Sequence, residues 1–107
     1  MNKQLRFTYQ DKEYVLEYNR QSVRQMEGQG FVLDEITAKP VTMIPLLFEG
    51  AFIKNCRGTK RKVIDSIYSE IGDKTALLEA LMEMYAETLS TLTDDSAEGN
   101  VSWAIVK

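Results

Sequence analysis

The chain contains no histidine and only one cysteine, Cys56. It therefore lacks the commonest general base and the commonest transition-metal ligand of proteins. A single cysteine forms no intrachain disulfide and cannot build a cysteine-based metal cage. The six glycines are scattered along the chain, so no phosphate-binding loop is present. These absences favour a binding protein over an enzyme, and they predict no catalytic residue, no metal site and no cofactor.

The sequence also has no apolar run long enough to cross a membrane, which takes about 20 residues. The longest run extends from Val41 to Ile53 and is followed by Lys54 and Arg57. At the N-terminus, Met-Asn-Lys-Gln-Leu leads directly into a strand pattern without an apolar signal region. We therefore expect a cytoplasmic protein with no membrane partner.

The apolar run predicts the element around which the chain is organised. Because it is apolar around most of its circumference, a helix formed by it has to be covered on several sides. We expect this central helix to be capped by Thr42 and to end near Cys56. Pro45 is compatible with it, since proline is tolerated in a first helical turn.

The remaining patterns predict an α+β fold, with one N-terminal β-hairpin packed on a small bundle of about four helices. Alternation over residues 5–9 and aromatic and aliphatic residues over 13–18 indicate the hairpin, with a polar turn at 10–12. A short helix is expected from a cap at Asn19 or Ser22 to about Gln29, ended by Gly30. A third helix is expected after Thr59, ended by Gly72, and a fourth after Asp73, reaching about Leu92.

A chain of 107 residues suggests a single domain with one core, and we place it at residues 1–93. Residues 94–107 are predicted to form an acidic, flexible spacer and a C-terminal tail that contains Trp103, the only tryptophan. A large aromatic side chain is costly to leave in water and is a typical interface anchor. Either the tail folds back onto the domain, or Trp103 docks on a partner.

Two surfaces are candidates for partner binding. The fourth helix carries an apolar stripe broader than one contact needs, and Met82, Tyr85 and Leu89 on it suit an adaptable binding face. Core packing is the commoner explanation of such a stripe. Basic residues gather at 57–62, where Lys60, Arg61 and Lys62 follow one another. A solvated turn is the favoured interpretation of this cluster, followed by an acidic protein partner. Nucleic acid comes last, because no repeated aromatic stacking platform lies near the cluster.

Three segments together resemble one known family. They are KEYVLEYNRQSVRQME at residues 12–27, GFVLDEITAKPVTMIPLLFEGAF at residues 30–52 and EGNVSW at residues 98–103. The chain resembles the small tail assembly chaperones of long-tailed phages and prophages of Gram-positive bacteria, and the resemblance covers nearly its whole length. It implies a protein that coats the helical, apolar tape-measure protein, helps to recruit tail-tube subunits and leaves before the virion is complete.

This resemblance carries over no catalytic or ligand-binding residue. It predicts a non-enzymatic chaperone in the bacterial host cell, with the tape-measure and tail-tube proteins as partners and with self-association left open. Two alternatives remain. One is a structural tail component retained in the virion, and the other is a small regulatory module that binds nucleic acid through residues 57–62.

Overall fold

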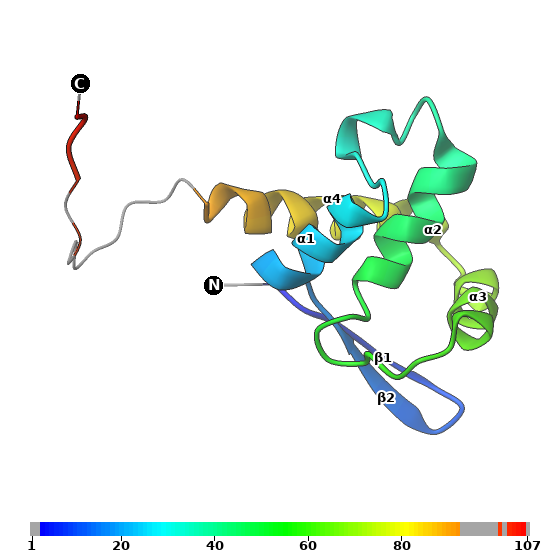
Figure 1. Ribbon diagram of the computed structural model, residues 1–107. Helices are drawn as coiled ribbons and strands as arrows, with labels where there is room; N and C mark the ends of the chain where they lie inside the picture. Colours follow the sequence, from blue (N-terminus) through cyan, green and yellow to red (C-terminus); the bar gives the residue numbers. More distant parts are fainter. Residues whose placement is uncertain (1–2, 93–100, 102, 107) are drawn as a thin grey trace.

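The computed structural model describes residues 3–92, 101 and 103–106. Two strands, β1 (Leu5–Tyr9) and β2 (Lys12–Leu16), precede all of the helices. The helices are α1 (Arg20–Gly28), the 3₁₀ turn η1 (Leu33–Glu35), α2 (Pro40–Gly50), α3 (Arg61–Glu70) and α4 (Lys74–Ser90) (Figure 1). The predicted α+β fold, a hairpin followed by four α-helices, is confirmed.

The hairpin is antiparallel, and Phe7 pairs with Tyr14 at its centre. Its turn has two residues, Gln10 and Asp11, rather than the three predicted, and both have positive φ, 50° and 65°. This is the geometry of a type I′ turn, whose twist matches that of paired strands. Phe7 stacks on Tyr14, and Tyr14 meets the edge of Phe52 with ring centroids 5.9 Å apart. The apolar face of the hairpin therefore packs on the segment that follows α2.

Helix α1 begins where the sequence predicts. The Asn19 side chain accepts a hydrogen bond from the Ser22 amide, and the Ser22 hydroxyl accepts one from the Asn19 amide, which forms a capping box. Gly30 follows the helix with φ +96°, a conformation that favours glycine. Val23 and Met26, which were expected to share a face, are both buried.

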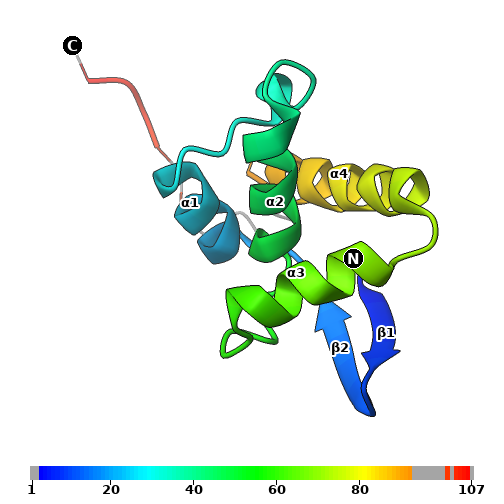
Figure 2. The same ribbon diagram turned by 90° about the vertical axis from the view of Figure 1, so that its right-hand side faces the viewer.

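Helix α2 is the centre of the bundle, as predicted, and it contacts α1, α4 and η1. Figure 2 shows it standing between α1 and α4, with α3 below. Its predicted ends were wrong. The helix begins at Pro40 and not after a Thr42 cap, because Lys39 before the proline has non-helical angles and takes the cap position. It ends at Gly50, and shorter-range backbone bonds continue the turns as far as Ile53.

Helices α3 and α4 differ in how they start. Asp73 caps α4 as predicted, since its carboxylate accepts a hydrogen bond from the Ala76 amide at 3.0 Å. The predicted Thr59 cap of α3 was wrong, because Lys60 occupies the cap position. Among the residues that the structure describes, the Thr59 hydroxyl is the buried side-chain group left without a hydrogen-bond partner.

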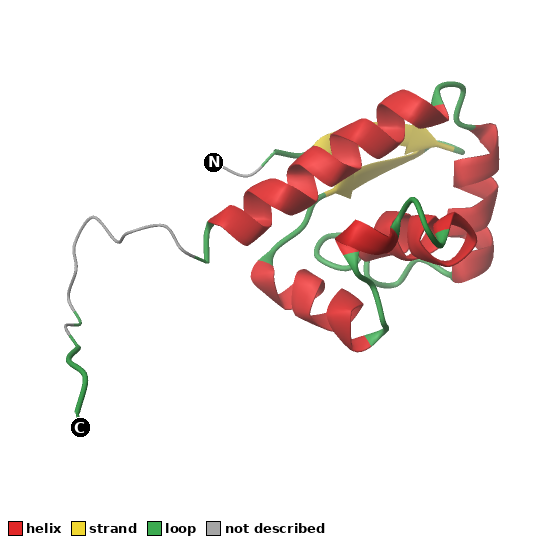
Figure 3. Ribbon diagram, turned by 90° about the horizontal axis from the view of Figure 1, so that it is seen from above, coloured by secondary structure: helices red, strands yellow, loops and turns green. Residues whose placement is uncertain are grey.

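The core lies between the hairpin and the helices and is rich in aromatic rings. Tyr85 of α4 meets the edges of Tyr18 and Phe31, with ring centroids 5.6 Å and 5.1 Å away. The Tyr18 hydroxyl donates to the Leu47 carbonyl of α2. Figure 3 shows α4 passing over the hairpin, with the other helices to one side of it.

Strand β2 is fastened to the segment that follows α2. The Glu17 amide donates to the Ala51 carbonyl at 3.1 Å. The buried Glu17 carboxylate accepts from Lys54 at 2.8 Å, from Gln4 at 2.9 Å and from Asn55 at 3.1 Å. Burial opposes the charge of Glu17, but hydrogen bonds from Lys54, Asn55 and Gln4 outweigh it, so the carboxyl pKa is lowered.

Candidate functional site

A groove runs between α1 and the C-terminal half of α4. One part is a hollow of about 410 Å³ whose wall includes Val32, Leu33, Tyr85 and Leu89. A second hollow of about 360 Å³ shares Leu89 with the first and continues along both helices. Together they form what we call the α1–α4 groove. Its lining comprises Arg20, Val23, Arg24, Glu27, Phe31, Val32, Leu33, Asp34, Tyr85, Thr88, Leu89 and Leu92.

The floor of the groove is apolar, and it is open to solvent at both ends. Val32 has 47% of its surface exposed at one end, and Leu92 has 62% exposed at the other. Leu89 lies between them and is half-buried. Scattered exposed apolar residues are ordinary, but a row that lines one hollow is typical of a surface that binds another apolar surface.

The rim of the groove is charged. Arg20, Arg24 and Glu27 lie along one side of α1, three and four residues apart, and are exposed. Arg20 also fixes the end of the groove, because its guanidinium donates to the carbonyl and to the hydroxyl of Thr91, just beyond α4. An apolar floor beside a rim that carries both signs of charge suits an amphipathic helix, whose apolar stripe is bordered by charges.

The predicted stripe on α4 is divided by the structure. Leu89 lines the groove with part of its surface free. Tyr85 also borders it, but only 2% of its surface is exposed, so it acts mainly as a core residue. Burial and the nearby charge of Glu27 raise the pKa of Tyr85. Met82 is half-buried against the core and does not line the groove.

Sequence reasoning missed Val32, Leu92 and the two arginines of the rim. Each looks ordinary in its own segment, and only the fold brings the three segments together. Leu92 is an apolar position near the end of the last helix, and Val32 lies two residues after Gly30. The missing signal was the packing of α1 beside α4, which no local pattern encodes.

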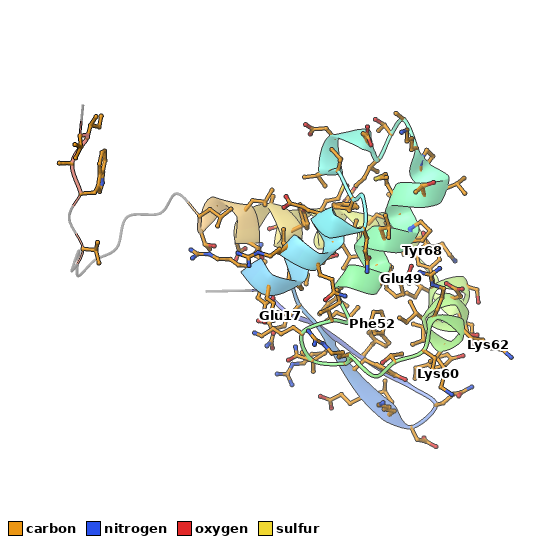
Figure 4. All side chains as sticks on the ribbon, viewed as in Figure 1. Glu17, Glu49, Phe52, Lys60, Lys62 and Tyr68 are labelled. Atoms are coloured by element: carbon orange, nitrogen blue, oxygen red, sulfur yellow. The ribbon has the colours of Figure 1, made fainter. Side chains whose placement is uncertain are left out.

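The basic cluster at 57–62 is not a single surface. Arg61 is paired with Glu49 of α2 at 3.0 Å, and nearby Lys54 is paired with Glu17. Lys60 and Lys62 are exposed at the start of α3, on its outer side (Figure 4). Within the described part of the chain, no ion pair holds either lysine. Arg57 is exposed as well, so the cluster contributes one structural contact, through Arg61, and three solvated cations.

The tail is described only in part. Trp103 is 83% exposed, and Val101, Ile105 and Val106 are exposed as well. The predicted flexible spacer, residues 94–100, lies outside the described residues, as does the predicted domain boundary at Thr93.

Other features offer less. A smaller hollow of about 150 Å³ between α2 and α3 is lined by Pro45, Phe48 and Tyr68 among others. Cys56 is half-buried, with its sulfur 3.7 Å from the Val15 carbonyl oxygen. In residues 3–92 and the described tail positions, no group of three acidic or cysteine side chains is placed to hold a metal ion. None of the helices in that same part of the chain is long and apolar enough to span a membrane.

A family model described as a domain of unknown function, DUF5055, matches residues 1–106. No curated protein and no solved structure matches the chain.

Proposed function

We propose that this chain, which belongs to the DUF5055 family, is a phage tail assembly chaperone that holds apolar helices of the tape-measure protein in its α1–α4 groove. In this proposal the protein is not an enzyme. It acts in the cytoplasm of the bacterial host, keeps the tape-measure protein soluble and helps to bring tail-tube subunits to it.

The α1–α4 groove is the observation that carries this proposal. A long helical partner that is apolar on one side aggregates unless that side is covered. The groove offers Val32, Leu89 and Leu92 as a partly exposed apolar floor for such a helix. Helix-in-groove recognition reads apolar anchors spaced three and four residues apart, and charged rims set the orientation of the bound helix.

The resemblance of residues 12–27, 30–52 and 98–103 to tail assembly chaperones supplies the identity of the partner. The absence of histidine supports a role without catalysis. The alternative of nucleic-acid binding through residues 57–62 is less favoured, because Arg61 is paired with Glu49 and does not add to a continuous positive surface. The alternative of a structural component predicts that the protein is found in purified virions, whereas a chaperone is absent from them.

A co-expression experiment tests the function. The tape-measure protein of the same phage or prophage is produced alone and together with this chain, and its soluble fraction is measured. We expect the soluble fraction to rise with the wild-type chain. Val32→Glu, which places a charge on the groove floor, should abolish the gain.

Val41→Glu is the matched control, since it makes the same chemical change at a valine that is 88% exposed and lies outside the groove. This control should keep the tape-measure protein soluble. If wild-type chain leaves the tape-measure protein insoluble, the chaperone function is wrong. If both valine variants work equally well, the function stands but the groove is not its site.

A further inference from the structure

The outer edge of β1 has unpaired backbone groups. In a hairpin with a two-residue turn, the residues flanking the turn, Tyr9 and Lys12, form a hydrogen-bonded pair, and bonded pairs then alternate with non-bonded ones. Arg6 and Thr8 are therefore in non-bonded pairs, and their amides and carbonyls point away from β2. Within the described part of the chain, no hydrogen bond reaches these backbone groups. An edge of this kind is a template for another strand.

The edge of β2 is different, because the segment after α2 covers it. The Val15 carbonyl faces the Asn55 amide and the Cys56 thiol, and the Glu17 amide is bonded to Ala51. Only β1 can therefore accept a third strand.

The inner face of the hairpin shows the same asymmetry. On β2, Tyr14 and Leu16 are fully buried, at 4% and 0% exposure. On β1, the inward residues Leu5, Phe7 and Tyr9 are only half-buried. The apolar layer is thus incomplete on the side of the open edge, and a third strand beyond β1 with apolar inward residues completes it.

The C-terminal tail has the sequence of such a strand. Val101, Trp103 and Ile105 alternate with Ser102 and Ala104, and most of these residue types favour strands. The three apolar side chains match in number and spacing the three inward residues of β1. Val101, Trp103 and Ile105 are all exposed in the single chain.

We propose that residues 101–106 of one copy of this chain add as a third strand to the open edge of β1 in a second copy. Trp103 then lies beside Phe7, whose ring stacks on Tyr14. One chain leaves both its edge and its tail uncovered, whereas two copies that exchange tails cover both. Reciprocal exchange has two-fold symmetry and closes at a dimer, which leaves no free edge for further growth. This inference needs no tape-measure protein and stands apart from the proposed function.

The oligomeric state of the full chain tests the proposal. Sedimentation over about a hundredfold range of concentration should show a monomer passing into a dimer. Trp103, the only tryptophan, should emit further to the blue as the dimer forms. Thr8→Pro removes the outward amide of β1 without removing a bond to β2, so this variant should stay monomeric and folded. Thr8→Val, which keeps the amide, is the matched control and should dimerise.

A mixing experiment identifies the two partners in the contact. A chain truncated after Asn100 has an edge but no tail, and the Thr8→Pro chain has a tail but a blocked edge. Each should be monomeric alone, and together they should form a heterodimer. A wild-type chain that stays monomeric throughout the range would overturn the proposal, as would a truncated chain that dimerises like the wild type. A blue-shifted emission that does not depend on concentration would also overturn it, because the tail would then be docked on its own domain.

Discussion

Helix α1 packs against α2 on one side and against α4 on the other, and the two contacts are filled to different degrees. On the α2 side, Met26 is fully buried against Gly50, and a Cβ added at Gly50 would come within 2.3 Å of the Met26 sulfur. On the α4 side, the α1–α4 groove leaves hollows of about 410 and 360 Å³. One flank of the same helix is closely packed, and the other leaves open space beside α4.

This difference separates stability from binding. A close-packed contact has no room for another group, so changes there cost folding free energy. A groove open to solvent tolerates changes in the folded chain, and such changes are felt only when a partner fills it. Variants on the α2 side of α1 should therefore lower stability, and variants on the α4 side should lower binding.

The largest effect is expected on the closed side. Met26→Ala leaves a cavity between α1 and α2 and should lower the free energy of unfolding by roughly 2–5 kcal/mol. Chemical denaturation measures the change. If the loss is under about 1 kcal/mol, the contact between the two helices is not packed as described.

A smaller loss is expected from overpacking the same contact. Gly50→Ala drives a methyl group into the buried Met26 side chain, whose thioether end has to shift, at a cost of about 1–3 kcal/mol. Gly28→Ala is the control, because a Cβ at this residue of α1 meets nothing within 4 Å. That variant should be unchanged or slightly more stable, since alanine favours the helix. Equal effects of the two alanines would show that helix propensity, not packing, sets the result.

Part of the fold could be predicted from the sequence, and part of it could not. The hairpin, the Asp73 cap, the central helix and an α1 cap at Asn19 or Ser22 were predicted, because each depends on residues close together in the chain, and the structure has Asn19 as the α1 cap. The Thr42 and Thr59 caps were wrong, since Pro40 and Lys60 set the helix starts instead. Local patterns identify helix ends only when no neighbour competes.

The candidate site was predicted less well than the fold. An apolar stripe on α4 was expected, but its pattern does not say which residues other helices cover. Tyr85 is part of the core, whereas Leu89 is half-exposed. Val32, from a segment distant in sequence, lines the same hollow as Leu89. A groove is a property of two elements and the space between them, so one sequence pattern cannot specify it.

Acid should weaken the contact that Glu17 makes between the end of β2 and the segment after α2. The pKa of Glu17 is lower in the folded chain than its ordinary value of 4.5. The unfolded chain then binds the proton more tightly, so the stabilisation is complete above the ordinary pKa and is lost as pH falls through the folded pKa. Unfolding measured from pH 7 down to about 3 should show this loss, and Glu17→Gln should flatten it. A wild-type and a Gln variant with parallel pH curves would exclude Glu17 as the source.

The smallest effect on stability is expected on the open side. Val32→Glu and Val41→Glu should each change the free energy of unfolding by no more than about 0.5 kcal/mol, since both valines already meet water. Thermal denaturation of the two variants beside the wild type checks this. A clear loss in Val32→Glu alone would mean that the groove floor supports the fold.

Binding of a helical tape-measure fragment tests the central claim most directly. A labelled fragment is titrated with the wild-type chain, with Val32→Glu and with Val41→Glu, and the anisotropy of the label gives each Kd. We predict similar Kd values for the wild type and Val41→Glu, and a Kd at least about tenfold weaker for Val32→Glu, which corresponds to about 1.4 kcal/mol. Equal affinity of all three proteins for the fragment would contradict the assignment of the α1–α4 groove as the binding site.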